Sequence, residues 1–366
     1  MRVLILTDDS FAARERAMLS RLEVGLADDG VRVVHAIPRK AAAWHQPEVF
    51  SQAMTYEAKG LALSRPWRAR QTLRTLEDLA GAEGRPADVI HCFGQRCWPF
   101  AAELARMTGA ALAVEIWCAE LIGQGIRVRS DGGAPAPVYF VPDSALERAA
   151  RAQDPNLPIR LTPWGVHTPG QPLEILRPDK AVSIILGGNG RDAGAIASFL
   201  EGFAAFAKQH PDVMVLADSA VIQRAQAWPV VRRLGLLDKF TLIPDLEARR
   251  ELALRADLLA LPEALGEHRT LTLDAMAHGM LVVAAADPLN GVLVDSRTAK
   301  LLDKPVADSW ASSLKWAFES RDQARSLAWS AREYVRLNRR ASAHVASVVD
   351  AYEWMTSGES IPFGAA

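Results

Sequence analysis

VLIL at residues 3–6 is a short run of apolar side chains, and polar residues follow it at 7–10. Residues 12–27 then carry apolar side chains at helical spacing, and VRVVHAI at 31–37 is a second apolar run, which Pro38 ends. Parallel strands are buried on both faces, so uninterrupted apolar runs are typical of them. Strand, helix and strand in this order predict a right-handed βαβ unit at the start of the chain.

The same alternation continues through most of the chain. Further strands are predicted at 87–93, 111–116, 139–142, 159–162, 182–186, 213–217, 240–243, 258–261 and 281–285. Helices are predicted between them, and the stretch 309–355 is helical by composition and period. Prolines and glycines gather between 163 and 178, which favours a linker there. The pattern predicts two doubly wound, Rossmann-like α/β domains, whose ligands are expected beyond the carboxyl ends of the strands, in a cleft between the domains.

Composition excludes several classes of protein. The 366 residues include 42 Lys and Arg against 43 Asp and Glu, so no basic field favours nucleic acid as a partner. The three cysteines, Cys92, Cys97 and Cys118, are too few for a disulfide framework and lack metal-site spacing. No apolar segment approaches the length of a membrane span, and the N-terminus does not resemble a signal peptide, so a cytoplasmic protein is expected.

Several stretches resemble the family-4 type glycosyltransferases, which have the GT-B fold of two Rossmann-like domains. LLALP at 258–262 with LDAMAHGMLVVA at 273–284 is similar to that family's AD-hhhhPS…E…LEAMA-G-PVVA block. Weaker similarities lie at FVPDS (140–144), LTPWGVH (161–167) and DSRTAKLL (295–302). The resemblance implies an acceptor-side domain at 1–168, a donor domain at 175–344, and a C-terminal helix at about 345–366 that crosses back to the first domain.

The resemblance also implies a reaction: transfer of a sugar from a nucleotide-sugar donor to an acceptor hydroxyl, with retention at the anomeric carbon. The nucleotide-sugar is then a substrate; no cofactor and no metal are expected. The family holds the donor diphosphate with an Arg and a Lys in a glycine-rich loop, which here is GGNGRDAG at 187–194. Asn189 and Ala193 stand where those cations are expected. Gly188 and Gly190 can still offer backbone N–H groups to an anion. Arg191 supplies one cation, at a different position of the loop from the family's Arg and Lys.

A pair of carboxylates contacts the donor sugar and ribose in this family. The second of the pair is Asp274, while the first falls on Gly266, with Glu267 one position later. Glu267 is therefore the expected catalytic acid of this loop, and His268, Arg269 and Thr270 beside it are expected donor contacts. The dipole of the helix that begins here offers Asp274 a structural alternative.

The expected acceptor side also departs from the family pattern. The loop after the first strand, with Ser10 and Phe11, has no glycine, and Trp117 stands near the place of a His-Asp pair. His91 and Glu115 are the expected catalytic residues of this side. A lone histidine at a strand end is more often structural, and tryptophans on such loops are often simply packed.

Two functions therefore stay open. One is a glycosyltransferase acting on a nucleotide-sugar and a carbohydrate or other hydroxyl acceptor. The other is a catalytically silent relative, which serves as a binding module or as the partner of an active glycosyltransferase, because the substitutions affect several chemical positions together. A peripheral membrane contact stays open as well, since residues 64–74 are locally basic.

Overall fold

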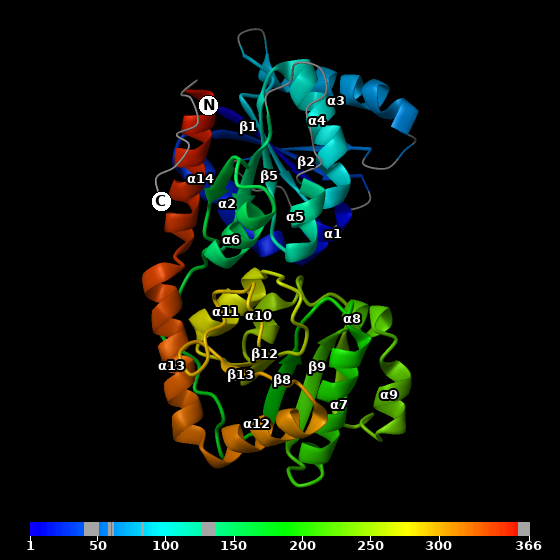
Figure 1. Cartoon of the computed structure of the whole chain (residues 1–366), viewed down its shortest axis with the longest axis vertical. Helices are drawn as coiled ribbons and strands as arrows, with labels where there is room; N and C mark the ends of the chain where they lie inside the picture. Colours follow the sequence, from blue (N-terminus) through cyan, green and yellow to red (C-terminus); the bar gives the residue numbers. More distant parts are fainter. Residues whose placement is uncertain (40–50, 58–59, 61, 82–83, 126–135, 358–366) are drawn as a thin grey trace. The chain divides into compact units, whose positions relative to one another are not determined.

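The computed structural model describes residues 1–39, 51–57, 60, 62–81, 84–125 and 136–357. The chain forms two compact units (Figure 1). Unit 1 comprises Met1–Trp164 and Ala341–Ala366, and unit 2 comprises Gly165–Arg340. The C-terminal segment expected at 345–366 lies outside the described residues beyond position 357.

Unit 1 is built on a seven-stranded sheet in which all paired strands are parallel. Its strands are β1 (Arg2–Thr7), β2 (Arg32–Pro38), β3 (Gln52–Tyr56), β4 (Val89–Phe93), β5 (Ala111–Glu115), β6 (Val138–Val141) and β7 (Ile159–Leu161), in the order β3-β2-β1-β4-β5-β6-β7. Its α-helices are α1 (Asp9–Arg14), α2 (Arg16–Asp28), α3 (Arg65–Ala80), α4 (Trp98–Thr108), α5 (Ala119–Gly125), α6 (Ser144–Gln153) and α14 (Ala341–Thr356). The 3-10 turn η3 (Gln95–Cys97) precedes α4.

Unit 2 repeats this plan with six parallel strands. They are β8 (Val182–Leu186), β9 (Val213–Asp218), β10 (Phe240–Ile243), β11 (Leu258–Leu261), β12 (Leu281–Ala285) and β13 (Lys300–Leu302), in the order β10-β9-β8-β11-β12-β13. Its helices are α7 (Ala193–Ala207), α8 (Ser219–Arg224), α9 (Trp228–Arg233), α10 (Arg250–Ala253), α11 (Thr270–His278), α12 (Ala307–Glu319) and α13 (Arg321–Asn338).

Each sheet has a topological switch point, where the strand order reverses. In unit 1 the first strand, β1, lies between β2 and β4, and in unit 2 the first strand, β8, lies between β9 and β11. Loops that leave two such neighbouring strands run to opposite faces of the sheet and leave a crevice between them. The two Rossmann-like units predicted from the sequence are therefore confirmed, and the loops to inspect are those after β1 and β4 and those after β8 and β11.

Some local predictions differ from the structure. The single helix expected at 12–27 is two helices, with Glu15 at the break. Helix α6 is capped by Asp143 and not by the next residue, Ser144: the Asp143 carboxylate accepts a hydrogen bond from the Ala145 N–H at 2.7 Å. A carboxylate accepts more strongly than a hydroxyl, so Asp143 is the better partner for the N–H groups at the start of the helix.

Within the described residues, no helix has the length and apolar character needed to span a membrane.

The last helix, α14, belongs to unit 1, where it packs against α2 and β4 (Figure 1). The approach to α2 is close at Gly25: a Cβ built there would lie 2.4 Å from Cγ2 of Val345. Val345 is buried, and its β-branched side chain has few alternative rotamers in a helix. The absence of a side chain at position 25 therefore sets the distance between the two helices.

This contact predicts a non-additive pair of substitutions. Gly25→Ala gains about 1 kcal/mol of helix propensity, but we expect the overpacking cost of about 1–3 kcal/mol to exceed it and the protein to be destabilised. In a Val345→Ala background the obstructing methyl groups are absent, so the same Gly25→Ala change becomes stabilising. Denaturant unfolding of the four proteins measures the coupling, and additive effects would show that α14 does not pack closely on α2.

Candidate functional site

The switch point of unit 2 brings together the loop after β8 and the loop after β11. The two strands pair directly, with Leu258 opposite Ile184, and the N–H of Gly187 donates to the carbonyl of Ala260. The loop after β8, residues 187–192, leads into α7, and the loop after β11, residues 262–269, leads into α11. Most of the expected donor-binding residues lie in these two loops or at the start of α11.

A carboxylate occupies the backbone amides of the 187–192 loop. Oε2 of Glu263 accepts hydrogen bonds from the N–H groups of Asn189 at 2.6 Å and Gly190 at 2.9 Å, and Oε1 accepts from the N–H of Asp192 at 2.7 Å. Carboxylate-to-amide bonds of this kind are charge-assisted and strong. Of the two glycine amides that the sequence suggested for a phosphate, that of Gly190 is thus bound to the protein's own side chain, together with those of Asn189 and Asp192.

Glycine at position 188 allows the loop to wrap around Glu263. Gly188 has a φ of +127°, and a Cβ built there would lie 2.3 Å from Oε2 of Glu263. Any side chain at this position would displace the carboxylate, and an L-residue would also be strained at this φ.

Arginines hold the opposite side of the same loop. Arg269 donates to the carbonyl of Gly188 at 3.5 Å, and Arg224 donates to the carbonyl of Asn189 at 3.2 Å. Arg191, the expected displaced cation, is exposed, and its backbone N–H donates to Oδ1 of Asn189 at 2.9 Å. Three backbone N–H groups of the loop therefore donate to a carboxylate, and two of its carbonyls accept from guanidinium groups.

The 262–269 loop is itself held by polar contacts within unit 2. Glu267 accepts a short hydrogen bond from the side-chain amide of Asn189. Buried His268 donates from Nε2 to the carbonyl of Leu289 at 3.1 Å, and Asp287 accepts from the N–H of Gly266 at 2.7 Å. The loop brings Glu267, His268 and Arg269 next to the 187–192 loop, as the sequence predicts, but His268 points at a neighbouring loop carbonyl.

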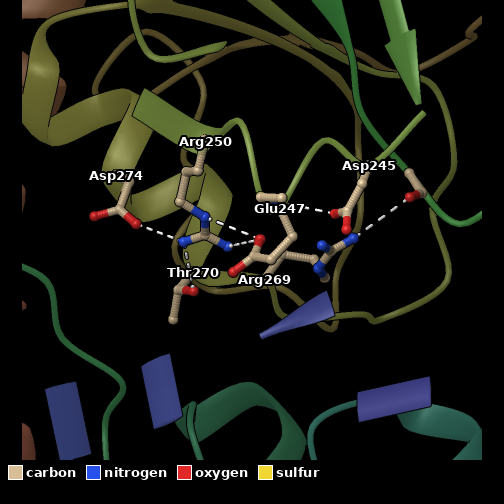
Figure 2. A network of polar contacts seen from close by, with 8 residues as sticks. Asp245, Glu247, Arg250, Arg269, Thr270 and Asp274 are labelled. Carbon is tan, nitrogen blue, oxygen red and sulfur yellow. Dashed lines mark hydrogen bonds and ion pairs between the residues drawn. The ribbon is translucent and has the colours of Figure 1, made fainter. Parts of the chain in front are cut away.

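Asp274 lies in a buried ionic network (Figure 2). Its Oδ2 accepts from Nη1 of Arg250 at 2.5 Å, and the same nitrogen donates to Oγ1 of Thr270 at 2.9 Å. Glu247 completes the network, because it accepts from Nη2 of Arg250 at 2.7 Å. The Asp274 side chain is 5% exposed, so this arrangement favours the structural alternative for Asp274 and Thr270: they join α11 to α10.

The switch point of unit 1 also contains a carboxylate. Asp8, which follows β1, accepts from the N–H of Phe11 at 2.8 Å and from the N–H of Arg96, after β4, at 3.1 Å. A Cβ at Gly94 would lie 2.3 Å from the carboxyl carbon of Asp8. Burial raises the pKa of the Asp8 carboxyl, and the two N–H donors oppose that shift. Asp8 therefore joins the segments that follow β1 and β4, as Glu263 joins the loops that follow β8 and β11.

The residues expected on the acceptor side are mostly buried. Phe11 packs within a cluster of aromatic rings, with centroid distances of 5.2 Å to Phe93, 5.8 Å to Trp117 and 6.1 Å to Trp164. Ser10 lies beside it in α1 and is half-buried. This packing favours the structural alternative for Trp117 and shows Phe11 to be part of the same buried cluster.

His91 and Glu115 belong to a buried chain of four polar side chains. Nδ1 of His91 lies 2.7 Å from the Tyr352 hydroxyl, Nε2 lies 3.1 Å from Oε2 of Glu115, and Oε1 of Glu115 accepts from Nε1 of Trp164 at 2.7 Å. Each of the four residues is at most 1% exposed. The chain ties α14, through Tyr352, to strands β4 and β5, so burial favours a structural role for this pair.

Burial makes both members of the His91–Glu115 pair neutral at pH 7. Desolvation lowers the pKa of His91 to about 3 and raises the pKa of Glu115 to about 8, against a smaller lowering by Trp164. A protonated Glu115 donates from Oε2 to Nε2 of His91 and accepts the Trp164 N–H on Oε1. The remaining proton of His91 then lies on Nδ1 and is donated to the Tyr352 oxygen, so every contact joins a donor to an acceptor.

Several of these residues were not predicted from the sequence. Glu263 carries the most direct signal, because an acid stands immediately after Pro262, where the family pattern has a small hydroxyl residue. Asp8 and Arg250 gave no comparable signal, since their partners are distant in sequence. Within the described ranges, no group of three or more His, Cys, Asp and Glu side chains is placed to hold a metal ion.

Comparison with known proteins identifies the fold. No family model matches the sequence, and no curated protein matches it. Among solved structures, sucrose-phosphate synthase from Thermosynechococcus elongatus matches with a TM-score of 0.73 at 13% identity, covering 98% of this chain and 100% of that chain. HepE from Anabaena in complex with UDP matches with a TM-score of 0.70 at 12% identity, covering 97% and 100%. A glycosyltransferase from Rickettsia africae matches with a TM-score of 0.68 at 12% identity, covering 98% and 99%. The protein therefore has the two-unit GT-B fold of these glycosyltransferases.

The neutral His91–Glu115 pair predicts how stability varies with pH. Glu115 binds its proton more tightly in the folded state, so its contribution is lost as pH rises from about 4.5 to about 8. The contribution of His91, whose folded pKa is lowered, is lost as pH falls from 6.5 to about 3. Between pH 4.5 and 6.5 the two groups change the free energy of unfolding in opposite directions as pH rises. Between pH 6.5 and 8 only the Glu115 effect remains, and it lowers the free energy of unfolding by about 1–2 kcal/mol.

Glu115→Gln tests this assignment. A glutamine amide can donate to His91 and accept from Trp164, but it does not titrate. We expect the variant to keep its stability near pH 5.5 and to lose the Glu115 part of the decline toward pH 8, measured by denaturant unfolding. Exposed Glu77→Gln is the control and should follow the wild type. An undiminished decline in Glu115→Gln would contradict a protonated Glu115.

The Asp274 network predicts a large effect on stability. Asp274→Ala leaves the Arg250 guanidinium buried with one fewer acceptor, so we expect the free energy of unfolding to fall by about 3 kcal/mol. The control is Glu201→Ala, which removes an exposed partner of Arg233 and should cost less than about 1 kcal/mol. Equal, small effects of the two substitutions would show that Asp274 is not structural and would return it to the donor-contact hypothesis.

Proposed function

We propose that the protein is a glycosyltransferase that moves a sugar from a nucleotide-sugar donor to an acceptor hydroxyl. The observation that carries this proposal is the full-length GT-B fold, shared with glycosyltransferases that include one solved in complex with UDP and with UDP-glucose. The fold alone does not define the chemistry, so the residues at the switch point of unit 2 must supply the rest of the argument.

The 187–192 loop supports the donor side of the proposal. Its amides of Asn189, Gly190 and Asp192 converge on the two oxygens of one carboxylate, which is an arrangement that also suits phosphate oxygens. We assign the donor diphosphate to this loop, where it would take the place of the Glu263 carboxylate. Arg191, which is exposed, is the assigned cation for the diphosphate. The leaving diphosphate would then be stabilised mainly by oriented N–H groups, a recognised mode of charge stabilisation.

We further propose retention at the anomeric carbon, following the resemblance to family-4 type enzymes. Glu267 is the assigned sugar contact, since its carboxylate reaches Asn189 of the donor loop. Arg269 supports the loop through the carbonyl of Gly188. His91 and Glu115 have no place in this proposal, because both are buried in unit 1 and bonded to Tyr352 and Trp164.

The catalytically silent relative remains the second candidate, and a specific observation favours it. The donor loop already holds an anion, Glu263, and the Asp274 carboxylate is engaged by Arg250. A protein with these contacts keeps its fold without any nucleotide. Such a protein would serve as a binding module or as the partner subunit of an active glycosyltransferase.

Binding calorimetry separates the two candidates. We expect the wild type to bind at least one member of a panel of nucleotides and nucleotide-sugars with micromolar affinity, and Arg191→Ala to weaken that binding about tenfold, through loss of a charge-assisted contact. Arg233→Ala, an exposed arginine of α9, is the matched control and should bind as the wild type does. A folded protein that gives no heat with any member of the panel would favour the silent relative.

A further inference from the structure

Glu263 uses both carboxylate oxygens to accept hydrogen bonds from backbone N–H groups of the 187–192 loop. Three consecutive or near-consecutive N–H groups of residues 189–192 converge on it at 2.6–2.9 Å. Such an arrangement satisfies amides that would otherwise lie unbonded at the switch point. It also means that an external anion and Glu263 compete for the same donors.

The loop cannot easily offer these amides to both groups. The carbonyls of Gly188 and Asn189 are bonded to Arg269 and Arg224, which opposes rotation of the peptide planes. Gly188 brings the backbone so close to Oε2 that even a methyl group would not fit between them. Each backbone N–H has one hydrogen to donate, and the N–H groups of Asn189, Gly190 and Asp192 donate theirs to Glu263, so the carboxylate must leave before a phosphate binds these amides.

Displacement of Glu263 requires only a side-chain rotation. Glu263 follows Pro262 directly after β11, is half-buried, and makes its hydrogen bonds to amides through a flexible side chain. Strand β11 is fixed on both sides by β8 and β12. The carboxylate can therefore swing away while the backbone that carries it stays in place.

We infer that Glu263 is an autoinhibitory residue: its carboxylate occupies the diphosphate position of the 187–192 loop and lowers the affinity of the loop for phosphate-bearing ligands. This inference rests on the proposed assignment of the donor diphosphate to the same loop. A ligand must bind the fraction of molecules in which Glu263 has left, so its apparent affinity is reduced by that fraction. Like-charge repulsion between Glu263 and an approaching phosphate adds to the effect.

The test measures binding of inorganic pyrophosphate by calorimetry to the wild type, Glu263→Gln, Glu263→Ser and Glu319→Gln. The last variant removes an exposed carboxylate on α12 and so matches the change in net charge. We expect Glu263→Ser to bind pyrophosphate about tenfold or more tightly than the wild type. Glu263→Gln should lie between them, because its amide keeps one acceptor oxygen, and Glu319→Gln should match the wild type.

A second substitution locates the gain. Adding Gly188→Ala to Glu263→Ser places a methyl group 2.3 Å from where Oε2 of Glu263 lay, so the tighter binding should disappear. Thermal unfolding gives an independent readout: Glu263→Ser should melt below the wild type, and pyrophosphate should restore it, because ligand binding stabilises the folded state.

The outcomes separate the inference from the proposed function. If neither Glu263 variant binds pyrophosphate more tightly than Glu319→Gln, the inference is wrong, even where the wild type binds a nucleotide-sugar. If Glu263→Ser gains affinity for pyrophosphate while neither it nor the wild type binds any nucleotide-sugar, the inference stands and the proposed function fails. Should Glu263→Ser not fold, Glu263→Gln, which conserves size, decides alone.

Discussion

Backbone amides in the segments that follow buried parallel strands need acceptors, and in this protein carboxylates supply them at both switch points. Glu263 does so in unit 2 and Asp8 in unit 1, each at the junction of the first strand with its neighbour across the reversal of strand order. An unbonded buried amide costs about 1–3 kcal/mol. The same positions bind ligands in other doubly wound proteins. The backbone N–H groups that need an acceptor in the free protein are therefore the groups that an anionic ligand would bind.

Charged side chains of unit 2 are paired with backbone groups or with opposite charges. Acids face amides and arginines face carbonyls along the 187–192 loop, and Arg250 is surrounded by Glu247, Thr270 and Asp274 beneath α11. Each of these charged groups thus has a partner of opposite sign or an oriented dipole, which limits the cost of its desolvation. Asp274, the acid that the family resemblance singles out, is bonded to Arg250 within unit 2, whereas the acid that binds the 187–192 loop is Glu263, at a position where the family pattern has no acid.

The sequence predicted the architecture well and the site in part. Apolar runs such as those at 182–186 and 258–261 match β8 and β11, because strands buried on both faces have predominantly apolar sequences. Strand β3 was missed because it lies at the sheet edge, where three of its five residues are exposed and the apolar signal is lost. The proximity of the 187–194 and 266–270 segments was also predictable, since both follow neighbouring strands. The contacts of Glu263 with the 187–192 loop and of His91 with Tyr352 were not predictable, because they join side chains to groups 74 and 261 residues away in the sequence.

Amide hydrogen exchange at Asn189, Gly190 and Asp192 in the free wild-type protein tests the central claim most directly. These residues lie in a loop outside regular secondary structure, so only a bound acceptor gives their N–H groups lasting protection. If Glu263 holds the loop, the three amides exchange slowly in the wild type and at least about tenfold faster in Glu263→Gln. Fast exchange of all three amides in the wild type, unchanged by the substitution, would contradict the account.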